Sequence, residues 1–295
     1  MNTAKPLGDW LAKKRVTLVG ALANSGLVLA KFTGGVLGQS QALIADAVHS
    51  LSDLVSDALV LLAARWGSED ADENHPYGHA RIETVSTVMI GGLLMAVALG
   101  FVLDAVGRLS APERLLQPGW LALTAALLSV AVKEWLFRFT RKVALQTQSP
   151  LIEANAWHHR SDALSSLVVI AGVAGAMVGF VWLDAVAAIV VALMVAWVGW
   201  RLIAQSVAEL IDTGLDEARL ALVDEIILSV DGVHAYRQLR TRRMAGQAYM
   251  DVQIYLDASL RLDQADTIAR EVRRRLLDGI PEMKDVVVGI RPQPN

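Results

Sequence analysis

The stretch ALIADAVHSLSDLVSDALVLL, residues 42–62, decides how this chain folds. It is long and apolar enough for the interior of a membrane, yet it carries His49 and Asp53. Residues four apart lie on one face of a helix, so these two side chains point toward one spot. An ionisable residue near the centre of a bilayer costs roughly 2.5–3.5 kcal/mol on insertion scales. The pair therefore indicates a function that offsets this cost.

A second apolar stretch repeats the spacing. In ANAWHHRSDALSSLVVIAGVAG, residues 154–175, Asp162 follows His158 by four positions. Together the two stretches offer two imidazole nitrogens and two carboxylates, and four costly residues of this kind indicate a shared ligand. The ligand class that fits these donors is a divalent metal ion.

The composition favours a membrane protein. The 295 residues are 54% hydrophobic and 19% charged, and the mean hydropathy is +0.42. A helix needs about 20 apolar residues to cross the hydrocarbon core. Six stretches satisfy this, at 14–37, 41–65, 82–107, 118–141, 151–178 and 181–204. The sequence predicts an all-α bundle of six transmembrane helices in residues 1–205. Because cysteine is absent, a disulfide framework and a thiolate metal site are excluded.

Loop charges predict the orientation of the bundle. Lys and Arg precede the first stretch, follow the second and close the fourth and sixth, whereas the turns at 36–40 and 179–184 hold neither. The positive-inside rule then places both termini and the loops at 66–81 and 143–150 in the cytoplasm. Dense Ala, Leu and Val with short loops favour a bacterial inner membrane.

The composition changes near Ser206, where apolar runs shorten and charge density rises. Residues 206–295 predict a small cytoplasmic α+β domain with the order αββαβ. The predicted elements are a helix at 214–230, strands at 234–244 and 247–257, a helix at 261–280 and a strand at 285–294. An open face or edge of this sheet favours dimerisation.

Four segments carry a resemblance to a known family. They are SQALIADAVHSLSDLVSD at 40–57, DENHPYGHARIE at 72–83, ANAWHHRSDALSS at 154–166 and LRTRR at 239–243. With the six predicted spans, they resemble the cation diffusion facilitator family, whose members export divalent metals in exchange for protons. The resemblance covers nearly the whole chain. It implies a homodimer with a ferredoxin-like cytoplasmic domain, one transport site per protomer and no prosthetic group.

The family pattern assigns the transport site to the two pairs. The four matching positions are His49, Asp53, His158 and Asp162. Such ligands suit a tetrahedral ion, Zn²⁺ best, although Cd²⁺ and Co²⁺ also fit. Family members with His at the position of His49 resemble the zinc-preferring branch, and a broader exporter of Fe²⁺, Mn²⁺, Co²⁺ or Cd²⁺ is the alternative. Hydrogen bonding between helices without metal is the structural alternative.

The same residues predict the coupling. A metal needs neutral imidazole and ionised carboxylate, so metal and protons compete for the site. Imidazole titrates near neutral pH, within the working range. We therefore expect proton antiport by alternating access.

Three neighbouring residues extend the helical faces of the pairs. Asp46 and Asp57 lie about one turn either side of the first pair, and Asn155 lies one turn before His158. They are expected to line an aqueous access path or to contact the ligands; the alternative is that they cap helix ends or are solvated in a wet cavity. Both readings stay open.

The loop at 68–81 holds a further group of potential ligands. Asp72, His75 and His79 have a spacing compatible with zinc, and family members often have a second metal site here. The alternative is a polar loop in which Pro76 and Gly78 set a turn.

Arg81 enters the third span, and Asp212 follows the sixth. The resemblance implies that these two residues form a salt bridge that ties the bundle to the cytoplasmic domain. Two exposed charges are the alternative.

The cytoplasmic domain departs from the family pattern. In many members certain positions of this domain hold His, Asp or Glu ligands. The matching positions here are Arg237, Gln253, Gly289 and Arg291, and His234 is the only histidine within residues 206–295. Because arginine cannot bind a metal ion, we predict no high-affinity binuclear zinc site in this domain.

Two other classes of protein could use the same four ligands. A membrane-embedded metal sensor or scaffold would keep the four ligands without transport. A metal-dependent hydrolase would need an open coordination position and a general base, which the four ligands do not leave, so no enzyme is predicted. No phosphate loop, ATPase motif or nucleic-acid module appears.

Overall fold

The computed structural model describes residues 4–67, 72–111, 113, 115–147 and 149–293. Within its helices, the side chains of 4–13, 56, 57, 59–67, 150, 151 and 154 lie outside this description. The chain divides into two compact units. The first is Met1–Leu59 with Ile90–Arg201, and the second is Val60–Met89 with Leu202–Asn295.

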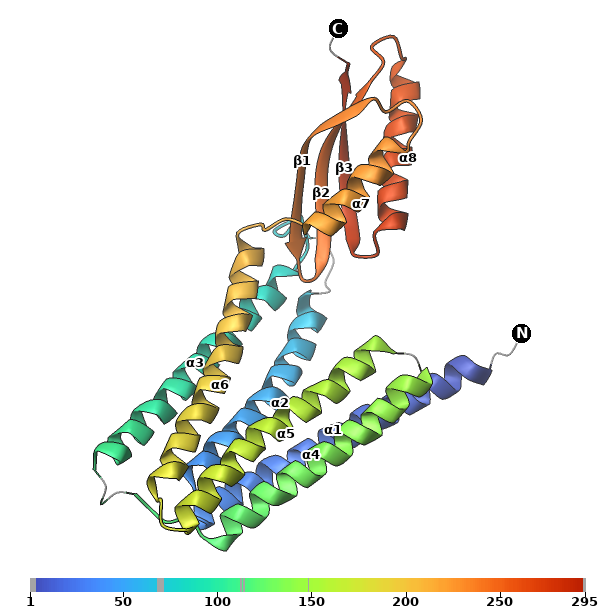
Figure 1. Ribbon diagram of the computed structural model, residues 1–295. Helices are drawn as coiled ribbons and strands as arrows, with labels where there is room; N and C mark the ends of the chain where they lie inside the picture. Colours follow the sequence, from blue (N-terminus) through green and yellow to red (C-terminus); the bar gives the residue numbers. More distant parts are fainter. Residues whose placement is uncertain (1–3, 68–71, 112, 114, 148, 294–295) are drawn as a thin grey trace. The chain divides into compact units, whose positions relative to one another are not determined.

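Six long helices run through the described residues (Figure 1). They are α1 (Ala4–Leu37), α2 (Gln41–Gly67), α3 (Arg81–Ser110), α4 (Trp120–Thr147), α5 (Pro150–Met177) and α6 (Trp182–Leu210). Five of them, all except α2, are long and apolar enough to cross a membrane. The protein is therefore a multi-pass membrane protein. The place of α2 as a sixth span stays a prediction.

Small side chains let the helices of the first unit pack closely. Its core contains alanines of α2, α4 and α6 together with valines of α5. A Cβ added at Gly172 of α5 would collide with Ala187 of α6, and one at Gly175 would collide with Leu183. Lipid removes the hydrophobic drive between helices, so such close backbone approach supplies the packing.

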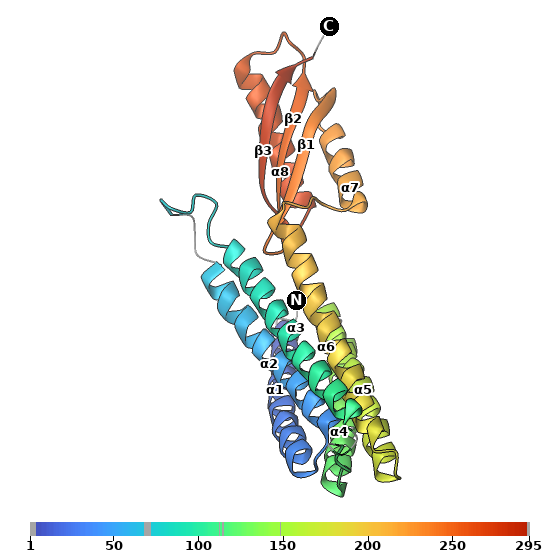
Figure 2. The ribbon, with the colours of Figure 1, turned by 90° about the vertical axis from the view of Figure 1, so that its left-hand side faces the viewer.

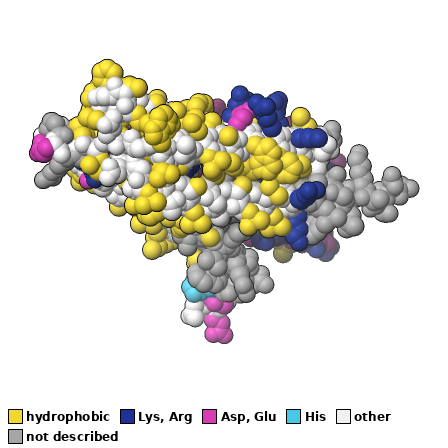
Figure 3. All heavy atoms as spheres, turned by 90° about the horizontal axis from the view of Figure 1, so that it is seen from below, with side chains coloured by type: hydrophobic (Ala, Val, Ile, Leu, Met, Phe, Trp, Pro, Cys, Tyr) yellow, Lys and Arg dark blue, Asp and Glu magenta, His cyan; other side chains and the backbone are white. Residues whose placement is uncertain are grey.

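The outward surface of the first unit is apolar. Leu22, Leu29, Trp135, Leu193 and Trp197 are each more than half exposed. In Figure 3, hydrophobic side chains cover much of the visible helical surface, and Lys and Arg gather toward one end. Large apolar patches of this kind mark a surface that contacts something other than water, here the lipid.

The second unit contains the small sheet. Its elements are α7 (Glu217–Leu228), β1 (Ala235–Met244), β2 (Gln247–Leu256), α8 (Leu262–Gly279) and β3 (Met283–Pro292), in the predicted order. The strand order is β1-β2-β3, with β1 antiparallel and β3 parallel to β2. A full ferredoxin-like unit has four strands, and the described residues hold three. The ferredoxin-like assignment therefore stays a prediction.

Alternation along β2 fixes which face is covered. Alternate residues from Ala248 to Leu256 are buried, and they pack with Val223 and Ile227 of α7 and Val272 and Leu276 of α8. Both helices lie on the same side of the sheet (Figures 1 and 2). The hairpin between β1 and β2 turns at Ala245 and Gly246, where φ is 49° and 73°. Positive φ at both central residues is what a two-residue hairpin turn needs.

Candidate metal centre

The structure brings three of the four paired ligands together. His49 and Asp53 lie on α2, and Asp162 lies on α5. One potential ligand atom from each lies within 4.8 Å of the other two. The two helices therefore present an imidazole and two carboxylates to one point.

The fourth residue stands at the edge of this group. His158 Nε2 lies 3.8 Å from Asp162 Oδ2, and the His158 side chain is 52% exposed, against 5% for Asp162. A cavity of about 580 Å³ borders the site. Its lining includes His49, Asp53, His158, Ser161, Asp162 and residues of α6 from Val190 to Arg201. All four residues of the two pairs therefore line this cavity, and His158 is far more exposed than Asp162.

One carboxylate oxygen in the group has no hydrogen-bond partner. Asp53 Oδ2 is buried, and no donor among the described residues reaches it. Buried polar atoms are almost always paired, so an orphaned carboxylate oxygen needs an explanation. Beside His49 and Asp162, a bound cation supplies one.

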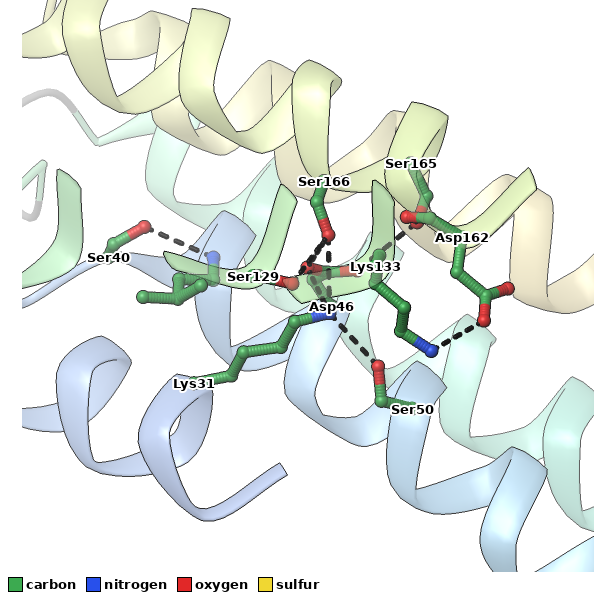
Figure 4. A network of polar contacts seen from close by, with 10 residues as sticks. Lys31, Ser40, Asp46, Ser50, Ser129, Lys133, Asp162, Ser165 and Ser166 are labelled. Atoms are coloured by element: carbon green, nitrogen blue, oxygen red, sulfur yellow. Dashed lines mark hydrogen bonds and ion pairs between the residues drawn. The ribbon is translucent and has the colours of Figure 1, made fainter. Parts of the chain in front are cut away.

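A buried lysine that sequence analysis missed contacts the group. Lys133 of α4 is 2% exposed, and its Nζ lies 2.6 Å from Asp162 Oδ2 (Figure 4). The signal was present in the sequence, because a lysine inside an apolar span is a functional candidate by default. What the sequence lacks is the partner, which is 29 positions away on another helix.

A second buried ion pair lies beside the first (Figure 4). Lys31 Nζ of α1 is 2.7 Å from Asp46 Oδ2 of α2, and both side chains are fully buried. Ser166 donates to the same aspartate at 2.9 Å, and Ser165 donates to it at 3.3 Å. Lys31 also donates to Ser50 at 3.0 Å. Asp46 is thus fully buried in a polar network between helices.

The structure says less about three other residues near the pairs, Asp57, Asn155 and His159. The Asp57 side chain lies outside the described residues. Asn155 is half-buried on α5. His159 is 3% exposed and neither of its ring nitrogens has a partner among the described residues, while a Cβ at Gly20 of α1 would lie 3.5 Å from its Nε2. His159 therefore packs toward α1.

The loop residues also come together. His75 Nδ1 is 3.1 Å from Asp72 Oδ1, and His79 Nε2 is 3.5 Å from Asp72 Oδ2. All three have ligand atoms within 4.8 Å of one another. The backbone N–H of His75 donates to Asp72 Oδ1 at 2.6 Å, and this hydrogen bond is the main reason that the pKa of Asp72 lies below its ordinary value.

The loop arrangement is therefore expected to be pH-dependent on the acid side. A depressed pKa means that the ionised form contributes stability above the ordinary value of 3.8, and this contribution is lost as pH falls through the lower, folded-state pKa. Titration of the ¹³C-labelled Asp72 carboxyl in the full chain should give a midpoint below 3.8. A midpoint at or above the ordinary value would contradict the hydrogen-bonded loop.

Arg81 and Asp212 meet in the second unit. Arg81 Nη2 lies 2.7 Å from Asp212 Oδ1, and both side chains are about half exposed. Next to them Thr84 donates to Glu209, whose Oε1 also accepts the backbone N–H of Ala245 at 2.7 Å. Polar contacts thus connect the start of α3, the end of α6 and the hairpin.

In the small sheet, the row with Gln253 holds no carboxylate or imidazole among the described residues. Gln253 pairs with Arg237 on one side and Gly289 on the other, and its Oε1 accepts from Arg291 at 3.2 Å. The prediction that this domain has no binuclear zinc site rests on these residue types.

Comparisons with known proteins match both parts of the chain. The family model described as the cation efflux transmembrane domain matches residues 17–211, and that of the cation efflux protein, cytoplasmic domain, matches residues 215–293. Solved structures of the MamM CTD align with 26% of this chain and 95% of their own at 23% identity, with a TM-score of 0.26.

Three curated relatives show the range of the similarity. Metal tolerance protein C1 of Arabidopsis thaliana is 36% identical over 95% of this chain. The match covers 62% of the length of that protein. Magnetosome protein MamB of Magnetospira is 34% identical over 91% of this chain and 92% of its own length. Manganese efflux system protein MneP of Bacillus subtilis is 29% identical over 95% of this chain and 96% of its own length. The chain therefore belongs to the cation diffusion facilitator family of membrane transporters.

Proposed function

We propose that this protein exports a divalent metal cation, Zn²⁺ first, in exchange for protons. The observation that carries the proposal is the convergence of His49, Asp53 and Asp162 within 4.8 Å, with His158 on the same cavity. The relatives named for metal tolerance and manganese efflux support transport over a sensor or scaffold. The metal is the cargo, and no prosthetic group or catalytic step is involved.

The donor set favours zinc. Two imidazole nitrogens and two carboxylate oxygens match tetrahedral Zn²⁺, and Cd²⁺ or Co²⁺ fit the same donors. Mn²⁺ and Fe²⁺ are the competing cargo, and the relative named as a manganese efflux system favours the first of these. Mg²⁺ and Ca²⁺ prefer oxygen-only shells.

The coupling follows from ligand chemistry. Metal binding needs neutral imidazoles and ionised carboxylates, so loading displaces protons and protonation ejects the metal. In the proposed cycle, cytoplasmic metal binds the deprotonated site, the bundle rearranges, and protons from the far side release the ion.

The proposed transporter is a homodimer in which each chain has a membrane part and a cytoplasmic part. Residues 1–205 would form six spans with cytoplasmic termini in a bacterial inner membrane, and 206–295 a ferredoxin-like cytoplasmic domain that mediates a homodimer. The match of residues 215–293 to the cytoplasmic-domain model supports this second part. Arg81 and Asp212 are proposed to stiffen the junction at their 2.7 Å contact.

Metal-dependent proton flux in proteoliposomes tests the function. We expect an imposed Zn²⁺ gradient to drive counter-movement of protons, read with an entrapped pH dye, and Cd²⁺ to substitute. Zn²⁺ binding without any flux would support the sensor alternative. A clear preference for Mn²⁺ or Fe²⁺ over Zn²⁺ would overturn the argument from the ligands and assign the broader exporter.

The loop cluster is proposed as a second, weaker metal site. Its carboxylate and two imidazoles are more exposed than the membrane group, with Asp72 and His75 about half exposed. The His79→Ala variant should bind one fewer Zn²⁺ per chain in equilibrium dialysis and keep most of its flux. Unchanged stoichiometry would favour the polar-turn alternative.

A further inference from the structure

The cargo site contains a cation of its own. Lys133 Nζ lies 2.6 Å from Asp162 Oδ2, the same oxygen that His158 Nε2 approaches to 3.8 Å. Both the lysine and the aspartate are 5% exposed or less, so water does not screen the pair. A charge-assisted hydrogen bond of this length is strong. Asp162 is thus neutralised whenever no metal is present.

We infer that Lys133 is a tethered competitor of the cargo metal for Asp162, and that it sets the affinity and release rate of the site. This inference rests on the proposed function of the four ligands. A carboxylate oxygen that accepts from an ammonium group has less negative charge to offer a divalent ion. The ammonium also repels that ion at close range in a poorly screened site.

Competition between Lys133 and the metal for Asp162 would favour turnover in a transporter. Four ligands without a counter-charge would hold the ion tightly, and each carboxylate left unprotonated after release would be a buried, uncompensated charge, which costs free energy. A built-in cation weakens the loaded state and stabilises the empty one. Both effects speed turnover at the expense of affinity.

The neighbouring pair provides a comparison for this role. Lys31 and Asp46 are equally buried and 2.7 Å apart, yet Asp46 lies outside the group of potential ligands. Two buried lysines therefore pair with two aspartates, and one of these aspartates is a proposed ligand. Lys133 is a positioning residue, because it acts on the metal through Asp162.

The test compares Zn²⁺ affinity and flux among variants of the full chain. All carry His79→Ala, so that the loop cannot contribute. In Lys133→Gln, we expect the Zn²⁺ dissociation constant, measured in detergent against a fluorescent chelator, to fall about tenfold. Flux should show both a lower KM and a lower kcat, since release slows. Lys142→Gln removes an exposed lysine from the same helix and should leave the dissociation constant, KM and kcat unchanged.

The charge-preserving variant Lys133→Arg should change the Zn²⁺ affinity in the opposite direction. Arginine can grip both carboxylate oxygens, so Lys133→Arg should raise the Zn²⁺ dissociation constant several-fold. A structural role would predict lower thermal stability in both variants with no such change of sign in affinity. If Lys133→Gln does not fold, Lys133→Arg decides alone.

The outcomes separate the two proposals. If the His79→Ala parent binds Zn²⁺, adding His49→Ala abolishes that binding and adding Lys133→Gln leaves it within about twofold of the parent, the inference about Lys133 is wrong and the site stands. Unchanged or tighter binding in Lys133→Arg overturns the inference as well. If His49→Ala in the same background binds Zn²⁺ as the parent does, the proposed site itself is wrong.

Discussion

Replacing Asp53 by asparagine is expected to abolish metal-driven flux and to weaken Zn²⁺ binding more than roughly 100-fold. Loss of a group that only supports a ligand already costs 10–100-fold, and Asp53 is placed to bind the metal itself. Asparagine keeps the shape of the side chain but not its charge. Binding is measured by calorimetry in detergent, and flux in proteoliposomes.

The same substitution should not destabilise the fold. Asp53 Oδ2 is buried without a hydrogen-bond partner among the described residues, so the wild-type protein carries the cost of a buried, unpaired charge. Removing that charge should leave the melting temperature of the metal-free protein equal or higher. Asp104→Asn serves as the control, because Asp104 is half exposed and pairs with Arg108 on α3. An Asp53→Asn protein that transports normally would remove Asp53 from the site.

Breaking the Lys31–Asp46 pair should give the largest loss of stability. Lys31→Met leaves Asp46 as an uncompensated buried charge, and removing one partner of such a pair costs about 3–5 kcal/mol. The double variant Lys31→Met/Asp46→Asn removes the charge and keeps an acceptor for Ser165 and Ser166. It should therefore regain most of the loss.

Thermal unfolding in detergent without metal measures both variants. A double variant as unstable as Lys31→Met would show that the lysine contributes by packing rather than by its charge. Lys31→Met with wild-type stability would contradict the ion pair itself.

Local periodicity explains what could be predicted of the site. The four-residue spacing placed His49 with Asp53, and His158 with Asp162, on single helical faces without any knowledge of packing. It could not show that Asp162 lies nearer the α2 residues than His158 does. That difference depends on how α5 is rotated against α2, which side-chain packing decides.

The lysines were missed for a related reason. Lys31 and Lys133 lie inside apolar stretches and have no acidic partner at helical spacing, although Glu134 follows Lys133 directly. Their aspartates are 15 and 29 positions away and reach them only through contacts between helices. A search for lysines in predicted spans would have found both residues, though not their partners.

For the fold, too, local sequence patterns predicted the order of the elements better than their exact ends. The strands predicted at 234–244 and 247–257 leave two residues for a turn, and the structure has a hairpin there with the predicted order of elements. Helix ends were less accurate. Hydropathy ends the fourth span at 141 and the sixth at 204, whereas α4 continues to Thr147 and α6 to Leu210. A helix satisfies its own backbone hydrogen bonds, so it need not end where the apolar residues end.

The position of His158 bears on how fast an ion can enter. A hydrated divalent ion is expensive to strip of its water in one step. If the four residues bind the cargo as proposed, an arriving ion would exchange its first water for the nitrogen of His158, which is 52% exposed, before it reaches Asp162, which is 5% exposed. The remaining waters would then leave one by one as the other ligands replace them. In the proposed site, the half-exposed histidine would thereby divide a single high dehydration barrier into several low ones.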